Sequence, residues 1–233
     1  MNRQLVFDLP QRVARNREAF LVAPCNAQAV DVIDNAAQWT QSWTQPVQWL
    51  YGPAGCGKTH LAAVLAADYD ALHIDAAHMT ADSFADLFDG SAQPEVVIVD
   101  RLEKMPKQAQ EALFHLLNHA RHAELRVLLL SRQPAAQLPI DLPDLVSRLK
   151  ALAAIEMQQP DDKVMYGLLD KLFTDRQINV EARVIDYMVP RISRDFAAMG
   201  ALVSALDAAA LANKKPITVP FVAQFLDQYV ADA

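Results

Sequence analysis

The first two thirds of the chain alternate short, continuous apolar runs with longer segments of helical periodicity. Five apolar runs predict β-strands, at residues 47–51, 71–75, 95–100, 125–131 and 153–157. Three further segments have the apolar spacing of helices, at residues 27–39, 60–67 and 107–124. Because buried strands that alternate with helices form parallel sheets covered on both faces, this part predicts an α/β domain with a five-stranded parallel sheet.

The pattern changes near residue 158, and no strand pattern follows. Four segments punctuated by prolines predict helices, at residues 163–173, 181–189, 194–212 and 219–229. We therefore expect three parts: an extended N-terminal arm at 1–19, the α/β domain at 20–158 and a small all-α domain at 159–233.

Composition narrows the class of protein. The chain has 233 residues, 52% of them hydrophobic, and a net charge of −7. No segment is dense in Lys and Arg, so we expect no strong direct binding of nucleic acid. Cys25 and Cys56 lack the spacing of a metal site or disulfide, which fits a reducing cytosol. No run is long enough to span a bilayer and the N-terminus has no apolar signal core, so we expect a cytoplasmic protein without a membrane partner.

Three of the six glycines fall in one octapeptide, Gly52 to Thr59, which reads G-x-x-x-x-G-K-T. This is the pattern of a phosphate-binding loop, whose backbone N–H groups and following helix N-terminus bind phosphates. A predicted strand precedes it and a predicted helix follows, which favours the loop over an ordinary turn. The expected nucleotide contacts are Gly52, Pro53, Ala54, Gly55, Cys56, Gly57, Lys58, Thr59 and His60.

The apolar strand that ends at Asp100 predicts the second half of this site. A carboxylate there, with the Thr59 hydroxyl, would hold Mg²⁺ largely through water; the alternative is a capping aspartate. Arg101 follows, where many ATP-hydrolysing proteins have a carboxylate that polarises the attacking water. Glu103 would point elsewhere if the strand continued, so we expect nucleotide binding with weak or no intrinsic ATPase activity. Ser131 is a candidate γ-phosphate sensor or a turn residue.

These motifs, the run Leu142-Pro143-Asp144-Leu145-Val146-Ser147-Arg148-Leu149 and the helical tail resemble the AAA+ module of the bacterial initiator DnaA, and more closely the DnaA-homologous regulators of the Hda family. The resemblance covers nearly the whole chain. It implies a three-layer P-loop AAA+ module followed by a helical lid, with ADP or ATP and Mg²⁺ as cofactors.

The resemblance also implies roles for individual residues. Arg148 would be an arginine finger that projects into the nucleotide site of a partner; the alternative is an i,i+4 pair with Asp144. Arg194 would be the "sensor 2" residue that reaches back to the phosphates, or else a solvated arginine beside a helix start. Val22 and Asn26 would lie against the adenine.

The N-terminal peptide Gln4-Leu5-Val6-Phe7-Asp8-Leu9 resembles the motif that docks on the DNA polymerase III sliding clamp. Gln4 would bind at the pocket edge, and Leu5, Phe7 and Leu9 would be apolar anchors. Asp8 stands where Pro or Ser is frequent. The alternative is an arm that packs on its own domain.

Another set of polar residues, His115, His119 and His122 with Glu111, lies on one predicted helix face. We interpret it as a solvated face rather than a metal site.

The resemblance thus implies a regulator that docks on the DNA-loaded clamp and stimulates hydrolysis of DnaA-bound ATP. Two rivals are an autonomous AAA+ ATPase of the helicase-loader type and an interaction module with a vestigial nucleotide site. A homodimer or higher oligomer is left open.

Overall fold

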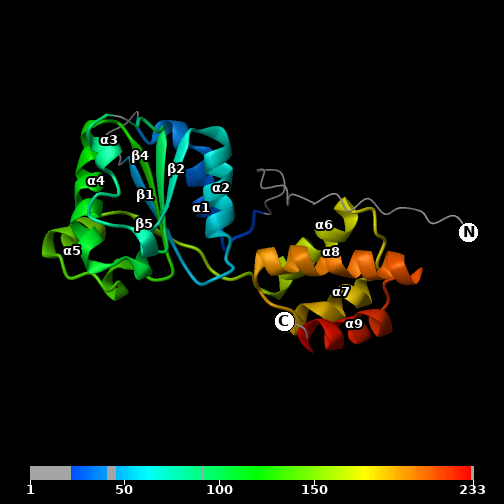
Figure 1. The fold of residues 1–233 in the computed structure, drawn as a ribbon. Helices are drawn as coiled ribbons and strands as arrows, with labels where there is room; N and C mark the ends of the chain where they lie inside the picture. The colour runs from blue at the N-terminus through cyan, green and yellow to red at the C-terminus, as the bar shows by residue number, and fades with distance from the viewer. Residues whose placement is uncertain (1–21, 41–45, 91, 232–233) are drawn as a thin grey trace, which may run out of the picture.

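The computed structural model describes residues 22–40, 46–90 and 92–231, which form an α/β domain followed by a helical domain (Figure 1). The sheet of the first domain is entirely parallel, in the order β2-β3-β4-β1-β5. Its strands are β1 (Val47–Tyr51), β2 (Ala71–Asp75), β3 (Val96–Asp100), β4 (Arg126–Ser131) and β5 (Ala154–Glu156).

Helices cover both faces of this sheet, as its near-continuous apolar strands require. They are α1 (Ala27–Asp34), α2 (Lys58–Asp68), α3 (Ala85–Phe88), α4 (Gln110–His122) and α5 (Pro143–Lys150). Alternate residues of each strand face opposite layers, so that Val97 and Val99 pack with α4 and α5 whereas Val96 and Ile98 pack with α1 and α2. The predicted three-layer fold is confirmed.

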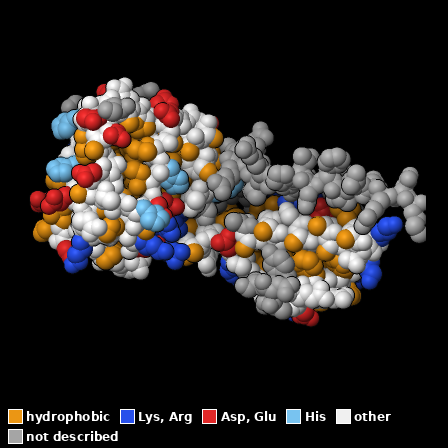
Figure 2. Space-filling model, in the orientation of Figure 1, with side chains coloured by type: hydrophobic (Ala, Val, Ile, Leu, Met, Phe, Trp, Pro, Cys, Tyr) orange, Lys and Arg blue, Asp and Glu red, His pale blue; other side chains and the backbone are white. Residues whose placement is uncertain are grey.

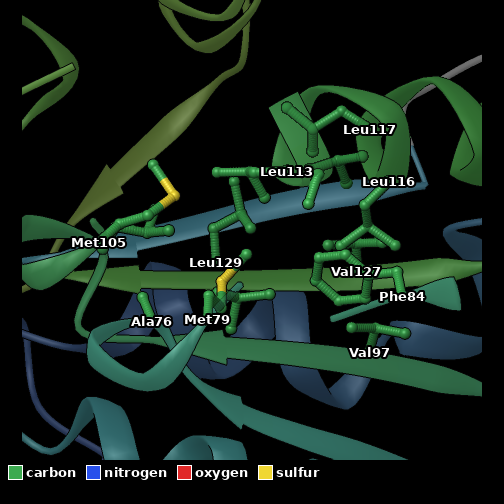
Figure 3. Close-up of a cluster of buried hydrophobic side chains, with 14 of the residues drawn as sticks. Ala76, Met79, Phe84, Val97, Met105, Leu113, Leu116, Leu117, Val127 and Leu129 are labelled. Atoms are coloured by element: carbon green, nitrogen blue, oxygen red, sulfur yellow. The ribbon is translucent and has the colours of Figure 1, made fainter. Parts of the chain in front are cut away.

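The core on the α4 side is built from large aliphatic residues. Figure 3 shows Leu113, Leu116 and Leu117 of α4 above Val127 and Leu129 of β4. All five side chains are at most 1% exposed. This packing fixes α4, and with it the polar residues that the helix carries on its other sides.

The described part of the second domain is built from the α-helices α6 (Asp162–Asp175), α7 (Ala182–Met188), α8 (Phe196–Asn213) and α9 (Val219–Ala231). They bury a separate core that includes Leu169, Phe173, Val203 and Val222. Within the described ranges, no helix combines the length and the apolar character needed to cross a membrane.

Helix ends differ from the sequence-based bounds where side chains cap the backbone. The predicted helix at 27–39 breaks at Asn35, whose amide donates to the Asp31 carbonyl at 2.8 Å, and a 3₁₀ turn follows. The predicted helix at 194–212 instead begins at Phe196, because the Asp195 carboxylate accepts a hydrogen bond from the backbone N–H of Ala198 at 3.0 Å.

Candidate nucleotide-binding site

The glycine-rich segment forms the turn between β1 and α2, at the carboxyl edge of the sheet. Gly52, Gly55 and Gly57 all have positive φ, at 152°, 79° and 101°. Glycine reaches these conformations without the steric cost that a Cβ imposes. The chain therefore turns sharply enough for α2 to begin at Lys58.

Two of these glycines also allow close approach of other parts of the chain. A Cβ on Gly52 would lie 2.0 Å from the carbonyl oxygen of Met157, just beyond β5. A Cβ on Gly55 would lie 2.6 Å from a carboxylate oxygen of Asp195, in the helical domain. The loop is thus built against both the sheet and the second domain.

Lys58 and Thr59 open α2 in the positions expected of a phosphate-binding loop. The Lys58 ammonium is buried and donates to the carbonyl oxygens of Gly52 at 2.6 Å and Pro53 at 2.8 Å. A phosphate would compete with these carbonyls for the same cation. His60 is half-buried on the same turn.

Thr59 and Asp100 lie together across the carboxyl edge. The Thr59 hydroxyl donates to a carboxylate oxygen of Asp100 at 3.3 Å, which joins the start of α2 to the end of β3. A hydroxyl and a carboxylate are hard oxygen ligands of the kind that Mg²⁺ prefers. These two residues fit the Mg²⁺ ion that the sequence predicts there.

Arg101 leaves β3 in a left-handed conformation, with φ of 60°. The strand therefore does not continue, and the guanidinium pairs with Asp75 at the end of β2. Glu103 turns toward β4, where its carboxylate accepts a hydrogen bond from the backbone N–H of Arg132 at 3.0 Å. Neither residue places a carboxylate directly after Asp100.

Ser131 is fully engaged in the turn after β4. Its buried hydroxyl accepts a hydrogen bond from the Trp49 indole at 2.9 Å and donates to the Gln133 carbonyl at 2.6 Å. This arrangement matches the turn role and leaves the hydroxyl directed at protein groups.

The segment at 22–26 lies beside the loop and the interdomain linker. Val22 is 48% exposed, whereas Asn26 is 2% exposed and accepts a hydrogen bond from the Ala23 backbone N–H at 2.8 Å. The Cys25 carbonyl accepts from the Gln158 N–H at 3.1 Å. Burial, followed by the nearby charges of Asp161 and Cys56, raises the pKa of the Cys25 thiol.

Arg194 points toward the linker in this structure. Its guanidinium donates to the Pro160 carbonyl at 2.8 Å and pairs with Asp162 at the start of α6. The contact with the phosphate-binding loop comes instead from the next turn, where the Phe196 N–H donates to the Gly55 carbonyl at 3.2 Å.

Arg148 lies at the opposite, amino edge of the sheet. It donates to the Asn118 side-chain oxygen at 2.5 Å rather than forming the alternative pair with Asp144. Both residues line a pocket of about 710 Å³ whose wall includes Val47, the first residue of β1. Because parallel strands carry the phosphate-binding loop at their other ends, Arg148 is remote from the site formed by its own chain.

Two polar residues of α4 that hold neighbouring segments were not identified from the sequence. Asn118 holds Arg148, and Gln110, which is 3% exposed, accepts hydrogen bonds from the backbone N–H groups of Asp141 at 3.1 Å and Leu142 at 2.9 Å. Gln110 stands at an apolar position of the helical pattern, and this signal could have indicated its role.

Two histidines of α4, His115 and His119, lie against aromatic rings. His119 packs edge-on against Phe88, with 5.6 Å between ring centroids. Across residues 22–40, 46–90 and 92–231, no three His, Cys, Asp or Glu side chains are grouped as metal ligands. The candidate clamp-binding residues Gln4, Leu5, Phe7 and Leu9 lie outside the described residues.

Comparison with family models divides the chain as the fold does. A model described as "Hda, lid domain" matches residues 162–226, from the start of α6 into α9. A model described as "RNA helicase" matches residues 48–130, from β1 to β4.

Two curated relatives match most of the chain. An uncharacterised protein of Haemophilus influenzae is 25% identical over 84% of this chain and 88% of its own length. The chromosomal replication initiator DnaA of Nautilia profundicola is 22% identical over 92% of this chain and 52% of its own length. The chain therefore spans about half the length of that DnaA.

Solved structures share the fold. Domain III of the Thermotoga maritima DnaA superposes with a TM-score of 0.73 at 16% identity, covering 94% of this chain and 98% of that domain. AMPPCP-bound DnaA from Aquifex aeolicus gives a TM-score of 0.69 at 19% identity, covering 82% of this chain and 64% of that protein.

Proposed function

Since the chain is a DnaA-like AAA+ protein with an Hda-type lid domain, we propose that it is a nucleotide-binding regulator of replication initiation. It docks on the DNA-loaded sliding clamp and presents Arg148 to ATP-bound DnaA. DnaA hydrolyses its ATP and is thereby inactivated.

The observation that carries this proposal is the position of Arg148. Its guanidinium lies at the amino edge of the sheet, whereas the phosphate-binding loop of the same chain lies at the carboxyl edge. A cation there can act on a phosphate only if a second molecule brings that phosphate to it. An arginine supplied in trans stabilises the charge that spreads over the transferring phosphoryl group.

The chain's own site supports nucleotide binding without rapid turnover. Lys58 and the paired Thr59 and Asp100 supply a cation for phosphates and oxygen ligands for Mg²⁺. Arg101, where a water-polarising carboxylate would be needed, supports slow hydrolysis. The ADP or ATP bound here then acts as a conformational effector of the regulator.

Clamp docking rests on the peptide at residues 4–9. Gln4 offers an amide for the pocket edge, and Leu5, Phe7 and Leu9 offer apolar anchors. Deletion of residues 1–9 should abolish clamp binding in a pull-down and leave nucleotide binding intact. Retained clamp binding would refute the docking step.

The central test is a DnaA ATP-hydrolysis assay with clamp loaded on DNA. Wild-type protein should stimulate hydrolysis, and Arg148→Ala should lose that stimulation while still binding the clamp. Lys150→Ala, which removes an exposed cation from the same helix, is the matched control and should behave as wild type. Equal stimulation by wild type and Arg148→Ala would overturn the mechanism.

An ATPase assay of the protein alone distinguishes the proposed regulator from the main alternative. An autonomous AAA+ ATPase would turn over ATP without DnaA, and Lys58→Ala would abolish that turnover. The regulator should show at most slow turnover under the same conditions.

A further inference from the structure

Two acidic residues end neighbouring strands side by side. Asp75 and Asp100 are register partners in the parallel ladder of β2 and β3. Like charges at adjacent strand positions repel, and only Asp100 contacts Thr59 at the candidate Mg²⁺ site. Asp75 is one strand further from the phosphate-binding loop, because β2 is an edge strand and β1 lies beyond β4.

Arg101 joins these two strand ends. Its backbone N–H donates to the Asp100 carboxylate at 2.7 Å, and its Nε donates to Asp75 at 2.9 Å. A second guanidinium nitrogen pairs with the other Asp75 oxygen, so that the contact is a two-point fork. The guanidinium is thereby drawn toward β2, away from β4 and β1.

The pair between Arg101 and Asp75 forms although the backbone conformation of Arg101 is unfavourable. Arg101 has φ of 60° and ψ of 46°, which crowd a Cβ. Asp75 is also fixed, since it accepts from the Ala77 N–H at 3.0 Å and lies 3.5 Å from the His78 ring nitrogen. On the face shown in Figure 2, basic and histidine side chains gather with acidic ones near the junction of the two domains.

We propose that Asp75 is a positioning residue that restrains Arg101, and that Arg101, when released, contacts the terminal phosphate of a bound nucleoside triphosphate. The residue after Asp100 is one position from the Mg²⁺ ligand, and a guanidinium matches phosphate oxygens with the same fork that it uses for a carboxylate. The pair therefore sets how strongly the site distinguishes a triphosphate from a diphosphate. The inference rests on the proposed nucleotide site and goes beyond it.

Asp75→Asn tests this directly, because it removes the charge and keeps an acceptor for the Ala77 N–H. Binding of ADP and of AMPPCP, each with Mg²⁺, is measured by calorimetry on the full chain. AMPPCP should bind to Asp75→Asn about tenfold more tightly than to the wild type, which is the gain expected of one charge-assisted contact. The affinity for ADP should change little. The double variant Asp75→Asn with Arg101→Ala should lose the gain.

Two further variants complete the test. Asp75→Ser removes the charge and keeps an oxygen acceptor for the Ala77 N–H, and should raise AMPPCP affinity in the same way if Asp75→Asn does not fold. Asp70→Asn removes the same charge just before β2, at the other end of that strand, and should leave both affinities unchanged.

Each outcome is decisive. If wild type binds both nucleotides and Asp75→Asn leaves their affinity ratio unchanged, the pair is only a structural link and the inference fails alone. A gain that persists without Arg101, or that Asp70→Asn reproduces, also overturns it. If wild type binds neither nucleotide, the proposed nucleotide site fails as well.

Discussion

Arg148 on α5 donates a hydrogen bond of 2.5 Å to the side-chain oxygen of Asn118 on α4. The acceptor is neutral, so it fixes the direction of the guanidinium without cancelling its charge. A carboxylate in the same place would hold the arginine more tightly and mask its charge. A neutral amide is therefore compatible with the proposed action of Arg148 on a second molecule.

Asn118→Asp should therefore lower the stimulation of DnaA ATP hydrolysis by about tenfold, since releasing a charge-assisted pair costs more than releasing a neutral one. The measurement is the rate of DnaA ATP hydrolysis at saturating and at limiting concentrations of the regulator. Asn118→Ala, which frees the guanidinium, should retain more activity than Asn118→Asp. The reverse order would show that Asn118 does not position a working cation.

Gln110→Ala should destabilise the segment that leads into α5. The substitution leaves the backbone N–H groups of Asp141 and Leu142 without their acceptor. Both hydrogen bonds are only partly buried, so we expect a cost of about 1 kcal/mol for each. Urea unfolding of the full chain measures the loss. Gln108→Ala, at an exposed position just before α4, is the control and should change the free energy of unfolding by less than about 0.5 kcal/mol.

The roles of these two amides could not be predicted from the sequence. The strands were predictable because continuous apolar runs have one stable use in a doubly covered sheet. Lys58, Thr59 and Asp100 were predictable because their spacing places them at one sheet edge. Gln110 and Asn118 act on groups about 30 positions away along the chain, and no local pattern encodes such a partner.

Arg101 and Arg194 mark a second limit. The absence of a carboxylate after Asp100 was evident from the sequence, but the left-handed backbone and the pair with Asp75 were not. For Arg194, the competing acceptors Pro160 and Asp162 become visible only when the linker is placed. A long cationic side chain has many reachable partners, so its direction depends on tertiary structure.

Cys25 should react slowly with iodoacetamide at pH 8. Burial raises the pKa of its thiol above the ordinary value of 9.0, so less thiolate is present in the folded protein. The rate should keep rising above about pH 10, where a thiol with the ordinary pKa is almost fully ionised and its rate levels off. The thiol of the unfolded chain loses its proton at a lower pH than the thiol of the folded protein. The stability that the protonated Cys25 thiol contributes is therefore complete below pH 9 and is lost as pH rises through the folded pKa. Cys25→Ser should remove both effects; a rate that reaches half its maximum at pH 9 would contradict the raised pKa.

Gly55→Ala should uncouple the helical domain from the phosphate-binding loop. A Cβ there would meet the Asp195 backbone at 2.8 Å, and the Phe196 N–H would lose its bond to the Gly55 carbonyl. Gly90→Ala is the matched control, since its φ of 82° imposes the same strain of about 1 kcal/mol where no described atom lies within 4 Å. Hydrogen exchange at residues 194–199 should accelerate in Gly55→Ala alone. Equal exchange in both variants would mean that the loop and this domain are not joined through Gly55, and that nucleotide occupancy must reach the helical domain by another route.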